Sequence, residues 1–122
     1  MPLIYKIVSR ELWAAATAAG RFDGAPVDLA DGYIHFSTRE QVEETAAKHF
    51  AGAADLLVAA FDTTDLGDAL VWEPSRGGAL FPHLYRPLDP AAARAVTALP
   101  LGADGRHDFS AIDAATRGGE AS

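Results

Sequence analysis

The segment Tyr33-Ile34-His35-Phe36-Ser37 alternates polar and apolar residues with the period of a β-strand. A period of two places Tyr33, His35 and Ser37 on one face and the two apolar residues on the other. An imidazole on a rigid strand can transfer a proton near neutral pH or bind a ligand hydroxyl, and a neighbouring phenol ring can stack on a flat ligand. The segment therefore predicts a histidine-centred site on the polar face of a short strand.

A second segment, Phe81-Pro82-His83-Leu84-Tyr85, repeats this arrangement and places His83 and Tyr85 on one face. We predict that His35 and His83 lie in one cleft as catalytic residues, with both tyrosines and Ser37 beside them as ligand-binding residues. The alternative is that each imidazole bonds a backbone carbonyl at a sheet edge and takes no part in chemistry.

Three charged residues near the second histidine can complete such a cleft. Glu73 follows Trp72 on a short predicted strand and can bond sugar hydroxyls or stabilise a cationic transition state, unless it is a solvated edge charge. Arg76 and Arg86 can each hold a phosphate or carboxylate through a two-pronged contact, unless they are ordinary surface residues. We expect Glu73 to be a third catalytic residue and both arginines to bind the ligand.

Other catalytic chemistries lack the residues or the spacing that they need. The sequence has no cysteine, which excludes thiol catalysis, disulfides and thiolate zinc sites. None of the four histidines has another histidine four residues away, so the helical metal-binding spacing is missing and we expect no metal site. We expect His49 to pack against the sheet from the apolar face of its helix.

The composition predicts one acidic domain without a membrane segment. The chain has 122 residues, 49% of them hydrophobic, a size typical of a single core. Its 17 acidic residues outnumber 10 basic ones, and the formal net charge of -7 argues against a protein that neutralises nucleic-acid phosphates. No apolar stretch approaches the length of about 18 residues typical of a membrane span, and no signal-peptide pattern opens the chain. We expect a cytoplasmic protein; its oligomeric state is open.

Short strands and two main helices must position these residues. Ser9 and Thr38 can cap helices, and Gln41 completes a capping box with Thr38. Leu56–Phe61 is a continuous apolar run, typical of a central strand buried on both faces. Pro82 favours a sheet edge or the start of a strand. The expected strands cover residues 3–8, 33–37, 56–61, 70–73 and 80–85, and the expected helices cover residues 10–19 and about 39–50.

These elements predict the α+β class: a single small domain over residues 1–101, with a mixed or antiparallel twisted sheet and two main helices. Asp89-Pro90 can open a short helix through Val96, and a final strand around Leu99 is the alternative. From Gly102 onward, Gly, Ala and Asp dominate, so we expect residues 102–122 to form a weakly ordered C-terminal tail.

Several motifs of the sequence resemble those of a known bacterial family, the domain-of-unknown-function family 952. The resemblance covers about residues 3 to 100, and it places Thr38 and Gln41 among the expected ligand-binding residues. The similar segments are Ile4–Ile7, Asp31–Thr38 followed by Gln41, Trp72–Pro74 and Leu80–Tyr85.

That family in turn resembles the ADP-ribosyltransferase superfamily, whose members split the nicotinamide–ribose bond of NAD. The resemblance implies a minimal ADP-ribosyltransferase-like core, with Lys6 near the ribose-anchoring position and His35 at the nicotinamide-stacking position. On the late strand this sequence has His83 where the superfamily has a glutamate. A lysine can donate but not accept a hydrogen bond, and a histidine is no anion, so Glu73 is the residue expected to replace the missing carboxylate.

Two functions of different classes are compatible with these features. The first is a small enzyme, or a degenerate enzyme, that binds NAD or another nucleotide or phosphorylated sugar between His35 and His83. The second is a non-catalytic module that holds a peptide or protein partner in the same cleft or at an exposed strand edge.

Overall fold

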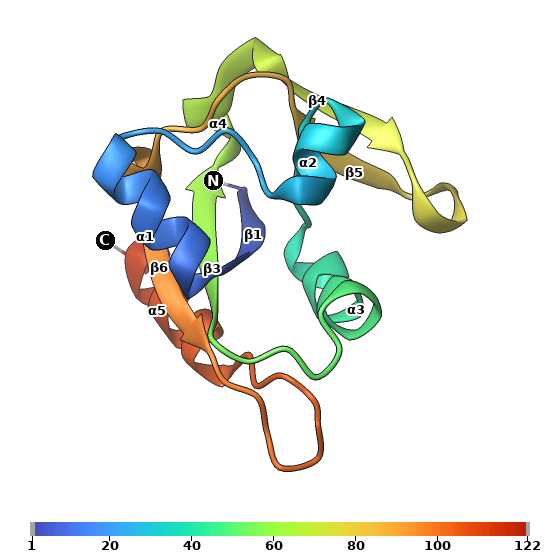
Figure 1. Ribbon diagram of the computed structural model, residues 1–122, viewed down its shortest axis with the longest axis vertical. Coiled ribbons are helices and arrows are strands. Elements are labelled where there is room, and N and C mark those ends of the chain that lie inside the picture. The colour runs from blue at the N-terminus through green and yellow to red at the C-terminus, as the bar shows by residue number, and fades with distance from the viewer. Residues whose placement is uncertain (1, 122) are drawn as a thin grey trace.

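Two three-stranded antiparallel sheets make up the strands in the part of the chain that the structure describes (Figure 1). The computed structural model describes residues 2–121, without the side chains of residue 76 and of residues 116–121. The first sheet has the strand order β1-β3-β6 and the second has the order β2-β5-β4. The strands are β1 (Leu3–Ser9), β2 (Ile34–His35), β3 (Leu56–Asp62), β4 (Leu70–Pro74), β5 (Leu80–Leu84) and β6 (Ala95–Leu99).

Helices connect the strands and cover the first sheet. They are α1 (Arg10–Ala19), α2 (Pro26–Asp31), α3 (Arg39–His49), α4 (Thr63–Leu66) and α5 (Ser110–Ala121), with short 3-10 turns at Gly67–Ala69, Arg76–Gly78 and Pro90–Ala92. The predicted α+β class is confirmed. In the described residues, no helix combines the length and the apolar character that crossing a membrane requires.

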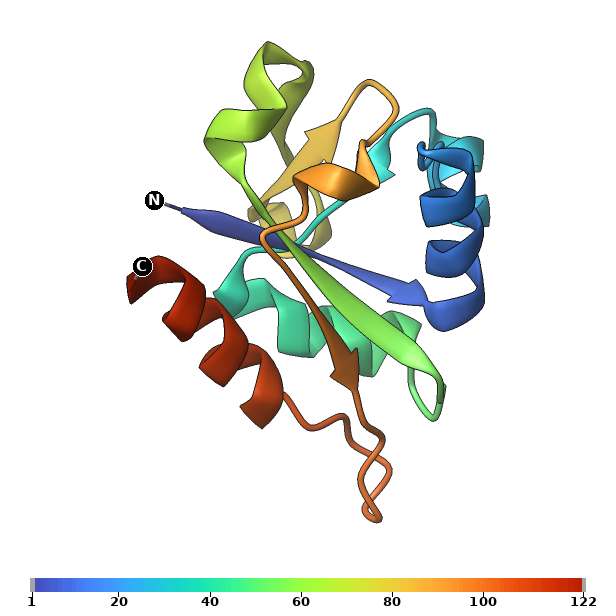
Figure 2. The same cartoon turned by 90° about the vertical axis from the view of Figure 1, so that its left-hand side faces the viewer.

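The central strand β3 is buried along its whole length, as its continuous apolar run predicts. Successive side chains alternate between the two faces of the sheet. One set packs with α1 and the second sheet, and the other set packs under α3 and α5, which lie on the same side of the first sheet (Figure 2). The apolar residues of one strand thus tie together two hydrophobic cores.

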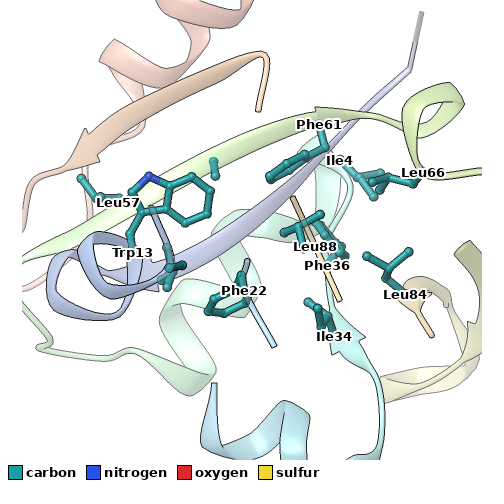
Figure 3. Packing of buried hydrophobic residues seen from close by; sticks show 13 residues of the cluster. Ile4, Trp13, Phe22, Ile34, Phe36, Leu57, Phe61, Leu66, Leu84 and Leu88 are labelled. Atoms are coloured by element: carbon teal, nitrogen blue, oxygen red, sulfur yellow. The ribbon is translucent and has the colours of Figure 1, made fainter. Parts of the chain in front are cut away.

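The larger core lies between the first sheet, α1 and the second sheet (Figure 3). Trp13 of α1 packs at 6.4 Å from both Phe22 and Phe61, measured between ring centroids. Phe36, just after β2, meets Phe61 edge to face at 5.8 Å. Edge-to-face pairs of this kind add to the free energy gained by burying their apolar area. This core therefore fixes the position of the second sheet against the first.

A backbone bridge also links the two sheets. The Tyr5 amide donates to the Ser37 carbonyl at 2.8 Å, and the Ser37 amide donates to the Tyr5 carbonyl at 2.9 Å. Since side chains alternate along β1, Lys6 shares a face with Ile4 and Val8, which belong to the core between the sheets. A lysine is thereby directed toward the second sheet.

The predicted helix caps are present. The Ser9 hydroxyl accepts from the Leu12 amide at 3.1 Å at the start of α1, and Gly20 ends that helix in the left-handed conformation. Thr38 and Gln41 form the capping box of α3, in which the Gln41 amide donates to the Thr38 hydroxyl at 3.2 Å and the Thr38 amide donates to Gln41 Oε1 at 3.0 Å. Local sequence therefore determines where both helices begin.

Two details differ from expectation, and a third decides between two alternatives. Pro82 lies on the central strand of its sheet and not at an edge. A proline is tolerated there because its missing amide would face the segment after His35, where β2 has already ended. The Pro82 carbonyl accepts from the Phe36 amide at 3.0 Å. His49 is exposed, and Phe50 is half-buried in its place. Ala95–Leu99 is a strand, which was one of the two alternatives for that region.

The segment after Gly102 contains a helix that is not predicted from the sequence. Within the predicted tail of residues 102–122, the described residues include the helix α5, which lies along β6, and residue 122 lies outside the described residues. Phe109 and Ile112 are buried in the second core, and Asp113 accepts two hydrogen bonds from the Arg39 guanidinium, at 2.6 and 2.8 Å. Two apolar side chains at helical spacing and one ion pair thus dock a segment whose other residues are mainly small or polar.

Candidate functional site

The two predicted histidines are directly opposite each other on neighbouring strands. β2 and β5 are antiparallel, and their register pairs His35 with His83. Their ring centroids lie 5.4 Å apart, with the rings edge to face. Opposed residues of adjacent strands point to the same side of the sheet. The structure therefore brings together two imidazoles that are far apart in the sequence.

Asp28 is the centre of the first half of the site. This buried carboxylate accepts from Lys6 Nζ at 2.8 and 3.1 Å, and it meets His35 Nδ1 at 2.6 Å. It also accepts from the backbone amides of Ala25, at 2.8 Å, and of His35, at 3.1 Å. Lys6 in turn donates to the His35 carbonyl at 3.0 Å. A buried ion pair thus holds both the backbone and the ring of His35.

The start of α2 places Asp28 at this position. Pro26 is the first helical residue, where its fixed backbone angle suits a helix start, and Asp28 accepts from the Ala25 amide that the helix leaves unsatisfied. Gly24, with a φ of +129°, lies directly against the aspartate: a Cβ at this glycine would be 2.8 Å from the Cβ of Asp28. The tight approach requires glycine at this position.

The charges of this group stabilise one another. Burial opposes ionisation of Asp28, but its hydrogen bond with His35 and the adjacent Lys6 outweigh that effect and lower the pKa of Asp28 to about 2. Burial also lowers the pKa of Lys6, and the attraction of Asp28 acts in the opposite direction. Asp28 is therefore ionised at neutral pH and supplies a fixed negative charge beside the ring of His35.

His35 is held from its other side as well. Its Nε2 lies 3.0 Å from the Oδ2 of Asp31, the last residue of α2, whose side chain is exposed. Both ring nitrogens thus face carboxylate oxygens, which only accept hydrogen bonds. Two carboxylates therefore hold the ring of His35 from both sides.

Glu73 is the centre of the second half of the site. Its Oε1 meets His83 Nδ1 at 2.8 Å and accepts from the Tyr85 hydroxyl at 2.6 Å. The bond from Tyr85, followed by that from His83, lowers the pKa of Glu73, and the same carboxylate raises the pKa of Tyr85 to about 12. Because Glu73 is ionised and accepts, His83 donates from Nδ1, which leaves Nε2 as the nitrogen that can meet a ligand.

Tyr33 joins the two halves. Its ring stacks on His83 with 4.1 Å between centroids and lies 4.6 Å from the ring of His35 and 5.3 Å from that of Tyr85. Stacking restricts the rotation of all four rings. The result is one aromatic cluster with a carboxylate bonded to each histidine.

A cavity of about 550 Å³ lies next to this cluster, and both histidines and Lys6 line it. The cavity extends along β1 toward the end of α3, where Ser37 and Thr45 line it. The hydroxyl groups of these two residues are hydrogen-bonded to each other at 2.8 Å. This volume is in the range of cavities that hold small organic ligands. Both histidines are bonded to carboxylates, and not to backbone carbonyls as the alternative interpretation expected.

The other predicted ligand-binding residues lie elsewhere. Thr38 and Gln41 cap α3, and Gln41 Nε2 donates to the Leu80 carbonyl at 2.7 Å, so neither lines this cavity. Tyr33, Tyr85 and Arg86 line a separate, smaller hollow of about 250 Å³. Arg86 there donates to the Leu66 carbonyl at 3.1 Å. The side chain of Arg76 lies outside the described residues.

Asp28 and Asp31 are not among the site residues predicted from the sequence. Asp31 precedes His35 by four residues, but its Asp-Gly pair indicated only a turn. Asp28 comes two residues after Pro26, the proline that starts a helix. An aspartate at this position indicates helix capping, and it does not indicate contact with a lysine on a strand. In the described part of the chain, no three His, Asp or Glu side chains are arranged to hold a metal ion.

Comparison with known proteins gives a family. The model of the family described as "Protein of unknown function (DUF952)" matches residues 7–96. The chain belongs to the DUF952 family. A search of curated proteins found no match.

Solved structures of one protein are similar to this chain. The crystal structure of protein CC0527 from Caulobacter crescentus is 54% identical, covers 92% of this chain and 98% of its own, and superposes with a TM-score of 0.87. The solution NMR structure of the same protein, also 54% identical, covers 92% of this chain and 97% of its own and gives a TM-score of 0.82. The predicted DUF952 membership is confirmed, whereas the comparisons give no support to the further resemblance to ADP-ribosyltransferases, which stays a prediction.

Proposed function

We propose that this protein binds a small organic molecule in the cavity beside His35 and His83 and that the two imidazoles act on it as an acid–base pair. One observation carries the proposal: the directly paired histidines each have a carboxylate on Nδ1, and both line one cavity of about 550 Å³. A carboxylate on Nδ1 fixes the orientation and the protonation of an imidazole, as general acid–base catalysis requires.

The two histidines have different roles in this proposal. His83, bonded to Glu73 through Nδ1, accepts a proton at Nε2 and acts as the base. His35, held between Asp28 and Asp31, is the acid of the pair and donates from Nε2 once Asp31 leaves that nitrogen. Asp31 is exposed and lies at the end of a short helix, so a ligand can take its place.

The resemblance to ADP-ribosyltransferases determines the first ligands to test. NAD, ADP-ribose and phosphorylated sugars are the nucleotide-type ligands that it implies, and an ADP-ribosyltransferase-like or NAD-processing activity would use Glu73 in place of the superfamily glutamate. Glu73 supports this choice because its lowered pKa keeps it anionic, as stabilisation of a sugar cation requires.

The test is NMR shift mapping of the imidazole nitrogens during titration with these compounds, together with calorimetry. We expect His35 and His83 to shift in the presence of a ligand and the ring of His107, which bonds the Ala53 carbonyl at 2.9 Å, to stay unchanged. His83→Ala should abolish binding, and His107→Ala should leave it intact. A broad small-molecule screen in which no compound moves either imidazole would contradict the proposal.

A second candidate function is the binding of a peptide along β4. This strand is the outer strand of its sheet, and it exposes Val71 and Trp72, with Leu80 of β5 exposed nearby. An extended peptide can add to such an edge through backbone hydrogen bonds. In a pull-down, loss of a specific partner in Trp72→Ala but not in His35→Ala would favour this function, and the reverse pattern would favour the cavity.

A further inference from the structure

The walls of the cavity beside the histidines are mainly apolar. Side chains from β1, α1, the start of α2, the segment after β2, the end of α3 and β5 contribute to them: Ile7, Leu12, Val27, Phe36, Phe50 and Phe81. A ligand that fills this volume gains free energy mostly by removing its own apolar surface from water. Most of the ligand must therefore be hydrocarbon.

Several polar side chains of the wall are already bonded within the chain. Lys6 is the one lysine or arginine among the described lining residues, and all its hydrogen bonds go to Asp28 and to the His35 carbonyl. The Ser9 hydroxyl caps α1, and the Ser37 hydroxyl bonds that of Thr45. A phosphate here would find no free lysine or arginine among the described lining residues and would lie near the buried charge of Asp28, which is unfavourable in a largely apolar cavity.

The imidazole end of the cavity offers a specific polar contact. His83 donates from Nδ1 to Glu73, so in the neutral ring Nε2 is the nitrogen that carries the lone pair and can accept a hydrogen bond. Its ring is buried and stacked on Tyr33, which fixes the direction of that lone pair. The group that matches it is a hydroxyl donor on the ligand.

We propose that the ligand of this cavity is an uncharged, largely apolar molecule with one hydroxyl group that donates to His83 Nε2. This inference rests on the proposed function, since it names the ligand class of the same site, and it selects against the phosphate-bearing ligands that the family resemblance implies. The proton of this hydroxyl is also the one that His83 would accept as the base of the proposed acid–base pair.

Three matched probes test the inference: 2-naphthol, 2-methoxynaphthalene, which lacks the donor, and 2-naphthyl phosphate, which carries the charge. Calorimetry and NMR mapping on the full chain should show 2-naphthol binding beside His83 at least about tenfold more tightly than either of the others. Glu73→Gln, a change at a partly exposed residue, should weaken the binding of 2-naphthol and leave the binding of 2-methoxynaphthalene unchanged. Val27→Lys, which adds a cation at an exposed wall position, should improve binding of 2-naphthyl phosphate alone.

The outcomes separate this inference from the proposed function. If 2-naphthyl phosphate, NAD or ADP-ribose binds at the histidines as tightly as 2-naphthol, the cavity takes phosphorylated ligands and the inference is overturned while the proposed function stands. Equal binding of 2-naphthol and 2-methoxynaphthalene also overturns it, because His83 then accepts no hydroxyl proton. If neither the naphthalenes nor the nucleotides shift the NMR signals of either imidazole, this inference and the proposed function both fail.

Discussion

Asp28 links a lysine of the first sheet to a histidine of the second, and its substitution tests how strongly they are coupled. In Asp28→Asn, the buried Lys6 ammonium loses its counter-charge and His35 Nδ1 loses an anionic acceptor. Breaking a buried ion pair from one side costs about 3–5 kcal/mol, because the remaining charge is left uncompensated. We expect a decrease of that size in the free energy of unfolding, measured by urea denaturation.

The control is a double-mutant cycle with Lys6→Met. Removing the lysine as well eliminates the unpaired charge, so the double variant should be clearly more stable than Asp28→Asn alone. Strictly additive effects of the two substitutions would mean that Lys6 and Asp28 do not stabilise each other.

The lowered pKa of Asp28 predicts a specific pH dependence of stability. The carboxyl titrates at about 2 in the folded protein, against its ordinary value of 3.8. The folded state then binds this proton less readily than the unfolded state, so the carboxylate contributes stability above about pH 4 that is lost as the pH falls toward 2. We expect the free energy of unfolding of the wild type to fall more steeply than that of Asp28→Asn in this window. Parallel curves for the two proteins would contradict the assignment.

For single residues, the sequence predicts the position of the two histidines but not the residues that bind them. The period of two in the segments around His35 and His83 places each on the polar face of its strand, because strand alternation is a local property. Asp28 reaches His35 and Lys6 only through the turn of α2 and the approach of two sheets, which is tertiary information. The ion pair is therefore not visible in the local sequence.

Among the elements, α5 gives the most direct test of packing. Ile112 is fully buried between this helix and β6, although the surrounding composition is weak. Truncation of a buried isoleucine to alanine costs about 2–5 kcal/mol, since it removes apolar contacts and leaves a cavity. We expect Ile112→Ala to lower the free energy of unfolding by that amount, measured by urea denaturation, and Ala111→Ser, at an exposed neighbour, to have a much smaller effect. Equal effects would mean that α5 is not docked as described.

Elements with strong local signals are the ones that the sequence predicts. Ser9 and Gly20 delimit α1, and the Thr38–Gln41 capping box begins α3, because caps act over three or four residues. The same reasoning fails at Pro82, whose tolerance depends on the early end of the neighbouring β2. It also fails at α5, where docking of Phe109 and Ile112 outweighs the weak composition.

For the whole molecule, the bridge between Tyr5 and Ser37 and the shared core predict that both sheets unfold together. The chain has two tryptophans, Trp13 in the core beside the first sheet and Trp72 on the outer strand of the second. In single-tryptophan variants, Trp72→Phe and Trp13→Phe, fluorescence therefore reports on one sheet at a time. Each variant should give a fluorescence transition that coincides with its own far-UV circular dichroism transition.

The comparison is made within each variant, because Trp13→Phe also changes the packing of the core and shifts the midpoint. A fluorescence transition of the Trp72 reporter that precedes the loss of circular dichroism would show that the second sheet opens independently, and that the histidine pair can be lost while the first sheet is intact.

The ion pair between Lys6 and Asp28 also has an evolutionary consequence. A lineage that loses the lysine keeps an uncompensated buried anion, and one that loses the aspartate keeps an uncompensated buried cation, so either single change is selected against. The two positions are expected to vary together among relatives. Relatives that retain the pair should also retain His35, whose ring and backbone depend on it.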